Sequence, residues 1–155
     1  MALYALGDLH LSFQADKPMD SFGKVWKNHE KKIEKYANRM VKPEDTLVLT
    51  GDHSWGRKLQ ECREDLAFIE RLPGRKILLR GNHDMFWDAK KTEKLNEEYK
   101  DRLFFLQNNF AVYQDYAMKL SPYAVPESGF SMAVGIDHRR NLIFLCDLCK
   151  RRTFF

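Results

Sequence analysis

TLVLTGDH, at residues 46–53, is the stretch that decides the fold, because a short apolar run ends in it on a glycine and polar residues follow at once. The same pattern occurs at residues 2–10, where an apolar run precedes GDLH, and at residues 76–84, where one precedes GNHD. Apolar runs this short, bounded by glycine, predict buried strands at residues 2–6, 46–50 and 76–80.

Apolar residues three and four positions apart predict helices between these strands. One such stripe predicts a helix over residues 20–40 with a lysine-rich outer face, and a second predicts a helix from residue 59 to the Pro73-Gly74 pair. Further on, a helix is expected at residues 90–100, and short strands at residues 103–106, 110–113 and 141–146. The alternation of strands and helices predicts the α/β class with parallel strands.

The bulk composition fits one globular domain over residues 1–155. Hydrophobic residues make up 44% of the chain and charged residues 31%, which excludes disorder, and the formal net charge is +4. The three cysteines form no regular framework, which favours reduced thiols. No signal peptide and no apolar stretch of about 20 residues is present, so we expect a cytoplasmic protein with no membrane partner.

Polar residues that follow three parallel strands are expected to meet, because ligands bind at the carboxyl ends of such strands. The residues concerned are Asp8, His10, Asp52, Asn82, His83 and Asp84. Carboxylate, imidazole and amide groups without a thiolate suit Mn, Fe or Zn. Asp8 and His10 would point to the same side of an extended backbone, and the two oxygens of Asp52 could bridge two ions.

The three motifs, Asp8-Leu9-His10, Gly51-Asp52 and Gly81-Asn82-His83-Asp84, resemble in order and context the first motif blocks of the calcineurin-like metallophosphoesterases. The resemblance covers roughly residues 1–115. It implies a four-layer α/β/β/α sandwich, two divalent metal ions and hydrolysis of phosphate mono- or diesters by activated water.

Carried over by position, the resemblance assigns roles to these residues. Asp8 and His10 would ligate the first metal ion, Asp52 would bridge both ions, and Asn82 would ligate the second.

Three neighbouring residues would act on the substrate side of the site. His83 would stabilise the phosphoryl group or protonate the leaving oxygen, and Asp84 would hold the His83 ring by a hydrogen bond. His53 follows the bridging carboxylate, so it either contacts the substrate or has a structural role.

The family pattern is not completed towards the carboxyl end. The family has a lone histidine and a G-H-x-H block there, whereas His138 is the only later histidine in this sequence. We therefore divide the domain into a family-like part, residues 1–117, and a divergent tail, residues 118–155, for which a frameshift in the encoding DNA is one hypothesis. The second sheet of the sandwich would then be largely missing, and a weak or inactive metal-binding fragment is the alternative function.

Several further features have competing interpretations. The lysine-rich helix face is either a solvated surface or the footprint of a basic nucleic-acid-binding module, the remote alternative function; otherwise nucleic acid enters only as a substrate. His29 is expected in the core, and Trp55 and Trp87 either pack in the core or wall the pocket. The Cys146-x-x-Cys149 pair has the spacing of zinc or redox sites. Substrate, metal and oligomeric state stay open.

Overall fold

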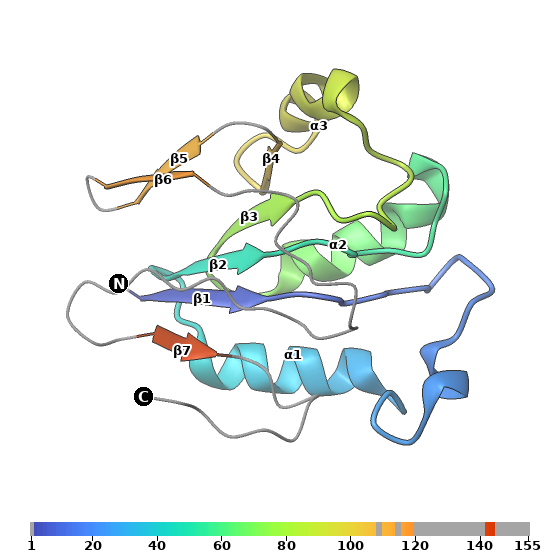
Figure 1. Cartoon of the computed structure of the whole chain (residues 1–155). Coiled ribbons are helices and arrows are strands. Elements are labelled where there is room, and N and C mark those ends of the chain that lie inside the picture. The colour runs from blue at the N-terminus through green and yellow to red at the C-terminus, as the bar shows by residue number, and fades with distance from the viewer. Residues whose placement is uncertain (1, 108–109, 114–115, 120–141, 145–155) are drawn as a thin grey trace.

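The computed structural model describes residues 2–107, 110–113, 116–119 and 142–144, and its centre is a parallel sheet. Every neighbouring pair of strands in this five-stranded sheet runs parallel. In spatial order the strands are β4 (Leu103–Leu106), β3 (Arg75–Leu79), β2 (Thr46–Leu49), β1 (Leu3–Leu6) and β7 (Leu142–Phe144) (Figure 1). The predicted α/β class and the parallel direction of the strands are confirmed.

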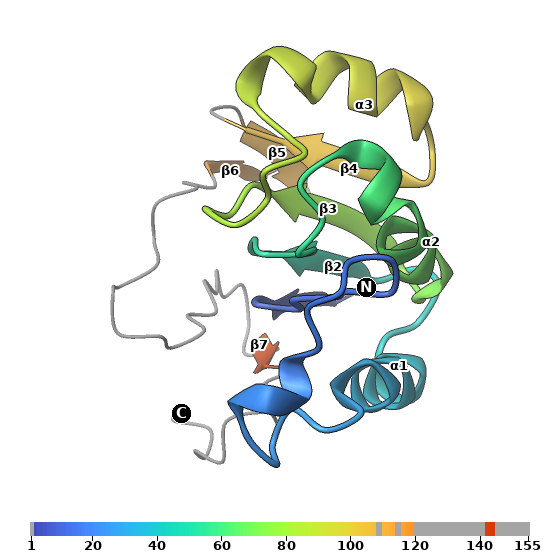
Figure 2. The same ribbon diagram turned by 90° about the vertical axis from the view of Figure 1, so that its right-hand side faces the viewer.

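Helices cover one face of the sheet. The described helices are η1 (Met19–Phe22), α1 (His29–Met40), η2 (Leu59–Cys62), α2 (Arg63–Arg71), η3 (Ala89–Lys91) and α3 (Thr92–Glu98). Helices α1 and α2 lie on the same face, and α3 lies beside the edge strand β4 (Figure 2). None of the described helices is long and apolar enough to cross a membrane.

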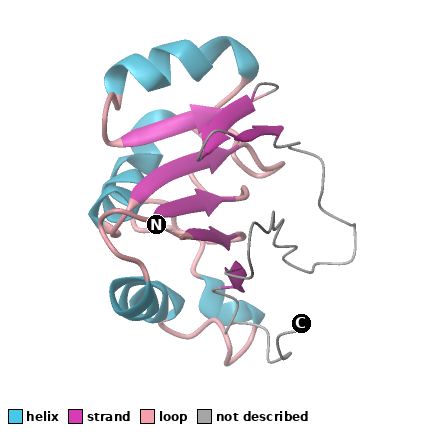
Figure 3. Cartoon of the chain, turned by 90° about the vertical axis from the view of Figure 1, so that its left-hand side faces the viewer, coloured by secondary structure: helices cyan, strands magenta, loops and turns pink. Residues whose placement is uncertain are grey.

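A second, smaller sheet contains the antiparallel strands β5 (Phe110–Tyr113) and β6 (Tyr116–Lys119) (Figure 3). Strands β4, β5 and β7 confirm the short strands predicted from the sequence. Strand β6 was not predicted, because a strand of four residues leaves little pattern in the sequence.

The larger core cluster lies between the sheet and helices α1 and α2. Alternation of side chains along each strand decides which residues enter it. Leu47 and Leu49 of β2 belong to the larger core cluster with Leu66 of α2, whereas Val48 belongs to a smaller cluster. Side chains alternate between the two faces of a strand, so the two clusters lie on opposite faces of the sheet. Leu66 is completely buried, which stabilises the fold by roughly 1.5–3 kcal/mol.

Helix α1 begins at His29, so the prediction of a helix from residue 20 is wrong at its start. Asn28 precedes it with φ 51°, in the left-handed region, and an α-helix of L-residues cannot continue through that conformation. Phe22, which was expected on the buried stripe, is 61% exposed. Residues 24–28, between η1 and α1, therefore form turns, and these bring Trp26 close to the ring of His10.

Candidate metal centre

The chain segments after β1 and β2 continue side by side beyond the ends of these strands. The amide of Asp8 donates to the carbonyl of Gly51 (3.1 Å), and the amide of His10 donates to the carbonyl of Asp52 (2.8 Å). An isolated parallel bridge between Leu11 and Ser54 extends the same pairing. Two segments about 40 positions apart in the sequence are thereby held together at the carboxyl end of the sheet.

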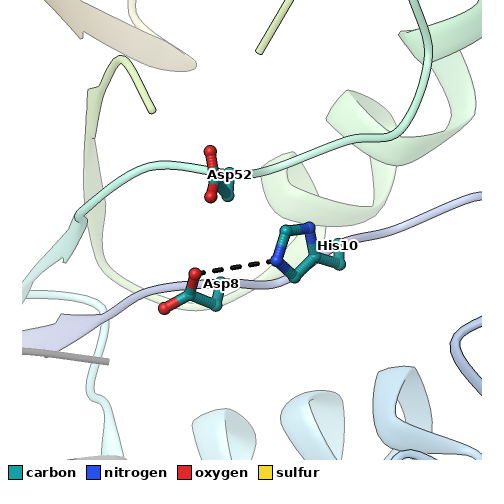
Figure 4. A group of neighbouring side chains, drawn as sticks. All are labelled: Asp8, His10 and Asp52. Carbon is teal, nitrogen blue, oxygen red and sulfur yellow. Dashed lines mark ion pairs between the residues drawn. The ribbon is translucent and has the colours of Figure 1, made fainter. Parts of the chain in front are cut away.

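Asp8, His10 and Asp52 come together at this edge (Figure 4). One possible ligand atom from each lies within 4.8 Å of the others, and Nε2 of His10 is 3.6 Å from Oδ1 of Asp8. Asp52 is 6% exposed and His10 9% exposed, while the side chain of Asp8 is 28% exposed. Two carboxylates and an imidazole at this spacing are a donor set that fits a divalent cation of the Mn, Fe or Zn type.

All three of these residues have a left-handed backbone. The φ angles are 53° at Asp8, 46° at His10 and 55° at Asp52. The side chains of Asp8 and His10 were predicted to converge because both residues would lie in extended backbone. They do converge, but both residues have a left-handed backbone instead. Asp and His tolerate this region better than most residues, and such conformations cluster at functional sites.

The segment after β3 joins the other two through Asp52. The amide of His83 donates to Oδ1 of Asp52 (2.9 Å), and a side chain on Gly81 would collide with the amide and the carboxylate of Asp52. Asn82 lies between these two residues and is exposed. Its predicted role as a ligand of a second ion stays a prediction.

The carboxylate of Asp84 is completely buried and binds the backbone of two segments. It accepts hydrogen bonds from the amides of Asp52 (2.9 Å), His53 (2.8 Å) and Gly81 (2.8 Å). A hydrogen bond to the ring of His83 was expected instead, and the described contacts of Asp84 do not include one. Asp84 thus holds the segments that follow β2 and β3 in register.

The two histidines beside the cluster differ in exposure. His53 is completely buried, and its Nε2 lies 2.9 Å from the carbonyl oxygen of Leu79, which favours the structural alternative over substrate contact. His83 is half-buried, with its ring 5.7 Å from the ring of His10 and 4.7 Å from that of Trp55. His83 therefore lies beside the cluster, and its predicted role towards the substrate stays a prediction.

The sequence left open whether Trp55 and Trp87 pack in the core or border the site, and the structure places them differently. The indole of Trp55 stacks on the ring of His10, with centroids 4.6 Å apart and an interplanar angle of 16°. Trp87 is completely buried and packs edge-on against Phe105 at 5.0 Å. Trp55 borders the candidate metal centre, whereas Trp87 is a core residue.

His29 is buried, as predicted, and it supports the first motif. Its Nε2 lies 2.9 Å from the carbonyl oxygen of Leu9, and its Nδ1 lies 3.1 Å from that of Trp26. A residue of α1 thereby contacts the backbone between the two candidate ligands Asp8 and His10.

Asp65 of α2 binds the segments that follow β1 and β2, a role that was not predicted from the sequence. It is completely buried, and it accepts hydrogen bonds from the hydroxyl of Ser54 and from the amide of Phe13 (2.9 Å). Burial raises the pKa of the Asp65 carboxyl above its usual range, while these two hydrogen bonds act in the opposite direction. One aspartate in a helix gives no recognisable pattern, so sequence reasoning had no signal for this role.

The calcineurin-like phosphoesterase family profile matches residues 1–147, and the chain belongs to this metal-dependent family. Among solved structures, the protein of unknown function AQ665 from Aquifex aeolicus is similar, with 28% sequence identity and a TM-score of 0.49. That similarity covers 75% of this chain and 57% of the other, so this chain spans little more than half of that protein's length. No curated protein matches the chain.

The family match continues past residue 117. The division between a family-like part and a divergent tail, with its frameshift explanation, stays a prediction. His138, Cys146 and Cys149 lie outside the described residues, as do the interpretations that depend on them.

Proposed function

We propose that this chain hydrolyses phosphate mono- or diesters with two divalent metal ions at the candidate metal centre. The observation that carries the proposal is the convergence of Asp8, His10 and Asp52, whose possible ligand atoms lie within 4.8 Å of one another at the carboxyl end of a parallel sheet. Membership of the calcineurin-like phosphoesterase family supports the same reaction class.

Each residue has a task in the proposed site. Asp8 and His10 would hold the first ion, Asp52 would contribute to both ions, and Asn82 would complete the protein contribution to the second. His83 faces the phosphoryl group, where it stabilises developing negative charge or gives a proton to the leaving oxygen. Divalent cations held there would supply Lewis acidity and would make a bound water molecule a better nucleophile towards phosphorus.

The packing around the site supports the positions of these groups. The amide of His83 donates to Oδ1 of Asp52 (2.9 Å). This hydrogen bond links the residue proposed to act on the phosphoryl group to the carboxylate proposed to contact both ions. The buried carboxylate of Asp84 fixes both segments through three backbone amides. This construction limits movement of the catalytic groups, which is what positioning for hydrolysis needs.

The test combines metal stoichiometry with hydrolysis of a generic aryl phosphodiester in the presence of Mn²⁺. We expect two bound ions in the wild-type chain and metal-dependent hydrolysis. Asp52→Asn should lose the second ion and reduce the rate by at least about a hundredfold, because its bridging oxygen pair is replaced. Glu97→Gln, an exposed residue of α3 that also loses one negative charge, is the matched control and should keep both properties.

Other outcomes would contradict the proposal in distinct ways. Hydrolysis that Asp52→Asn leaves unchanged would refute the bridging role. Metal binding without hydrolysis would favour the alternative of a metal-binding fragment. Salt-sensitive binding to DNA or RNA in the absence of metal, with no hydrolysis, would favour a nucleic-acid-binding module.

A further inference from the structure

Among the residues that the structure describes, none gives the ring of His10 the hydrogen bond that usually fixes a metal-binding histidine. Such a histidine normally donates its second ring N–H to a carboxylate or a carbonyl group, which sets the orientation of the ring. In the described part of the chain, the buried Nδ1 of His10 has no hydrogen-bond partner, and Nε2 is 3.6 Å from Asp8, beyond hydrogen-bonding distance. The orientation of this ring therefore has another cause.

Aromatic packing surrounds the His10 ring. The indole of Trp55 lies parallel to it at 4.6 Å, with an interplanar angle of 16°. Trp26 and His83 approach it at steeper angles, 62° and 65°, with centroids 6.0 and 5.7 Å away. A stacked ring restricts the rotation of its partner about the Cβ–Cγ bond, because turning the imidazole would break the face-to-face contact.

The side chain and backbone of Trp55 are themselves held by several contacts. Its amide donates to the carbonyl of Leu11 (2.9 Å), and its indole N–H is 3.1 Å from the sulfur of Met19. The ammonium group of Lys17 lies 3.2 Å from the centroid of the indole, which adds a cation–π contact. These partners all lie in residues 11–19, the segment that follows β1 and the first-motif ligands Asp8 and His10, so the indole is fixed relative to those two candidate ligands.

We propose that Trp55 is a positioning residue that holds the imidazole of His10 in the orientation required to bind the metal ion. The stacked indole takes the place of the hydrogen bond that other metal-binding histidines receive. This inference rests on the proposed function, since it concerns a ligand of the proposed metal centre.

The first test measures the affinity of the full chain for Mn²⁺, and separately for Zn²⁺, by isothermal titration calorimetry. Trp55→Leu keeps an apolar side chain but removes the aromatic face, and we expect about three- to tenfold weaker binding, the effect of losing one aromatic pair. Trp55→Phe keeps a ring face and should bind within about twofold of wild type. Leu95→Ala, which destabilises the core at a buried residue of α3, should lower stability without changing the affinity.

The results separate positioning from general destabilisation. Trp55→Leu with wild-type affinity would overturn the role of Trp55. So would Trp55→Phe as weak as Trp55→Leu, because the indole N–H would then matter and the ring face would not. A comparable loss in Leu95→Ala would also overturn it, because destabilisation alone would explain the effect.

The second test needs neither metal nor a variant that folds poorly. In a ¹H–¹³C spectrum of the metal-free wild-type chain, the ring current of the stacked Trp55 should shift the Cε1–H resonance of His10 upfield of its position in the unfolded chain. Trp55→Leu should remove this shift, and an unshifted wild-type resonance would overturn the proposed stacking. A shifted resonance in a chain that binds neither ion would refute the metal centre, and with it the positioning role, while leaving the ring contact intact.

Discussion

Replacing Asp84 tests whether its carboxylate holds backbone segments together or orients the His83 ring. Oδ2 of Asp84 accepts hydrogen bonds from the amides of Gly81 and Asp52, and Oδ1 accepts one from the amide of His53. In Asp84→Asn one oxygen can keep two of these bonds. The new amide group then faces the remaining backbone N–H, which leaves two buried donors pointing at each other.

The expected loss of stability follows from these contacts. One hydrogen bond to a charged group contributes about 1.5–3 kcal/mol, so Asp84→Asn should lower the free energy of unfolding by about 2–4 kcal/mol. Asp84→Ala leaves three buried donors unsatisfied, at about 1–3 kcal/mol each, and should lower it by at least about 3 kcal/mol. Both variants should also lose metal affinity, because Asp52 is no longer held in place.

Urea denaturation followed by tryptophan fluorescence measures these free energies. Asp88→Asn is the matched control, because Asp88 is an exposed capping residue at the start of η3, where Asn and Asp serve almost equally well. Suppose that Asp84→Asn unfolds within about 0.5 kcal/mol of wild type while hydrolysis is lost. The backbone role would then be refuted, and the ring-orienting role expected from the sequence would be correct.

Three further predictions concern the groups around the centre. Burial raises the pKa of Asp65, so the stability that its carboxyl contributes is fully present below the unfolded pKa of ~3.9 and is lost as the pH rises through the folded pKa. Urea titrations should therefore show Asp65→Asn gaining stability relative to wild type as the pH rises above about 4. Burial raises the pKa of the Cys62 thiol to about 12, so iodoacetamide at pH 8 should leave Cys62 unmodified in peptide mapping until the chain unfolds. A methyl group at Gly81 would collide with Asp52, so Gly81→Ala should lose about 1–3 kcal/mol of stability in urea and bind Mn²⁺ more weakly in calorimetry; wild-type values for both would contradict the close approach.

The strands and the convergence of their polar residues could be predicted, because both depend on local pattern and on a general property of parallel sheets. An apolar run closed by a glycine identifies β2, and strand direction then places Asp52 at the same edge as Asp8. The start of α1 could not be predicted, since the left-handed conformation of Asn28 leaves no signal in the spacing of apolar residues.

The partners of individual side chains were also out of reach. Asp84 was expected to bind its sequence neighbour His83, but its carboxylate binds amides that include two from another segment. Asp65 and Ser54 meet only because α2 packs beside the segment after β2. Such pairings depend on how distant segments pack, which neither periodicity nor motif spacing encodes.

The left-handed backbone of Asp8, His10 and Asp52 implies a trade-off between their proposed function and the stability of the fold. Each such residue raises the energy of the folded chain by about 1–3 kcal/mol at most, and glycine would adopt the same conformation without that penalty. Exchanging one of them for glycine would relieve this strain while abolishing the chemistry, but at Asp52 it would also leave the amide of His83 without its acceptor. A lineage released from the need for hydrolysis would no longer be required to keep this backbone strain at these three positions.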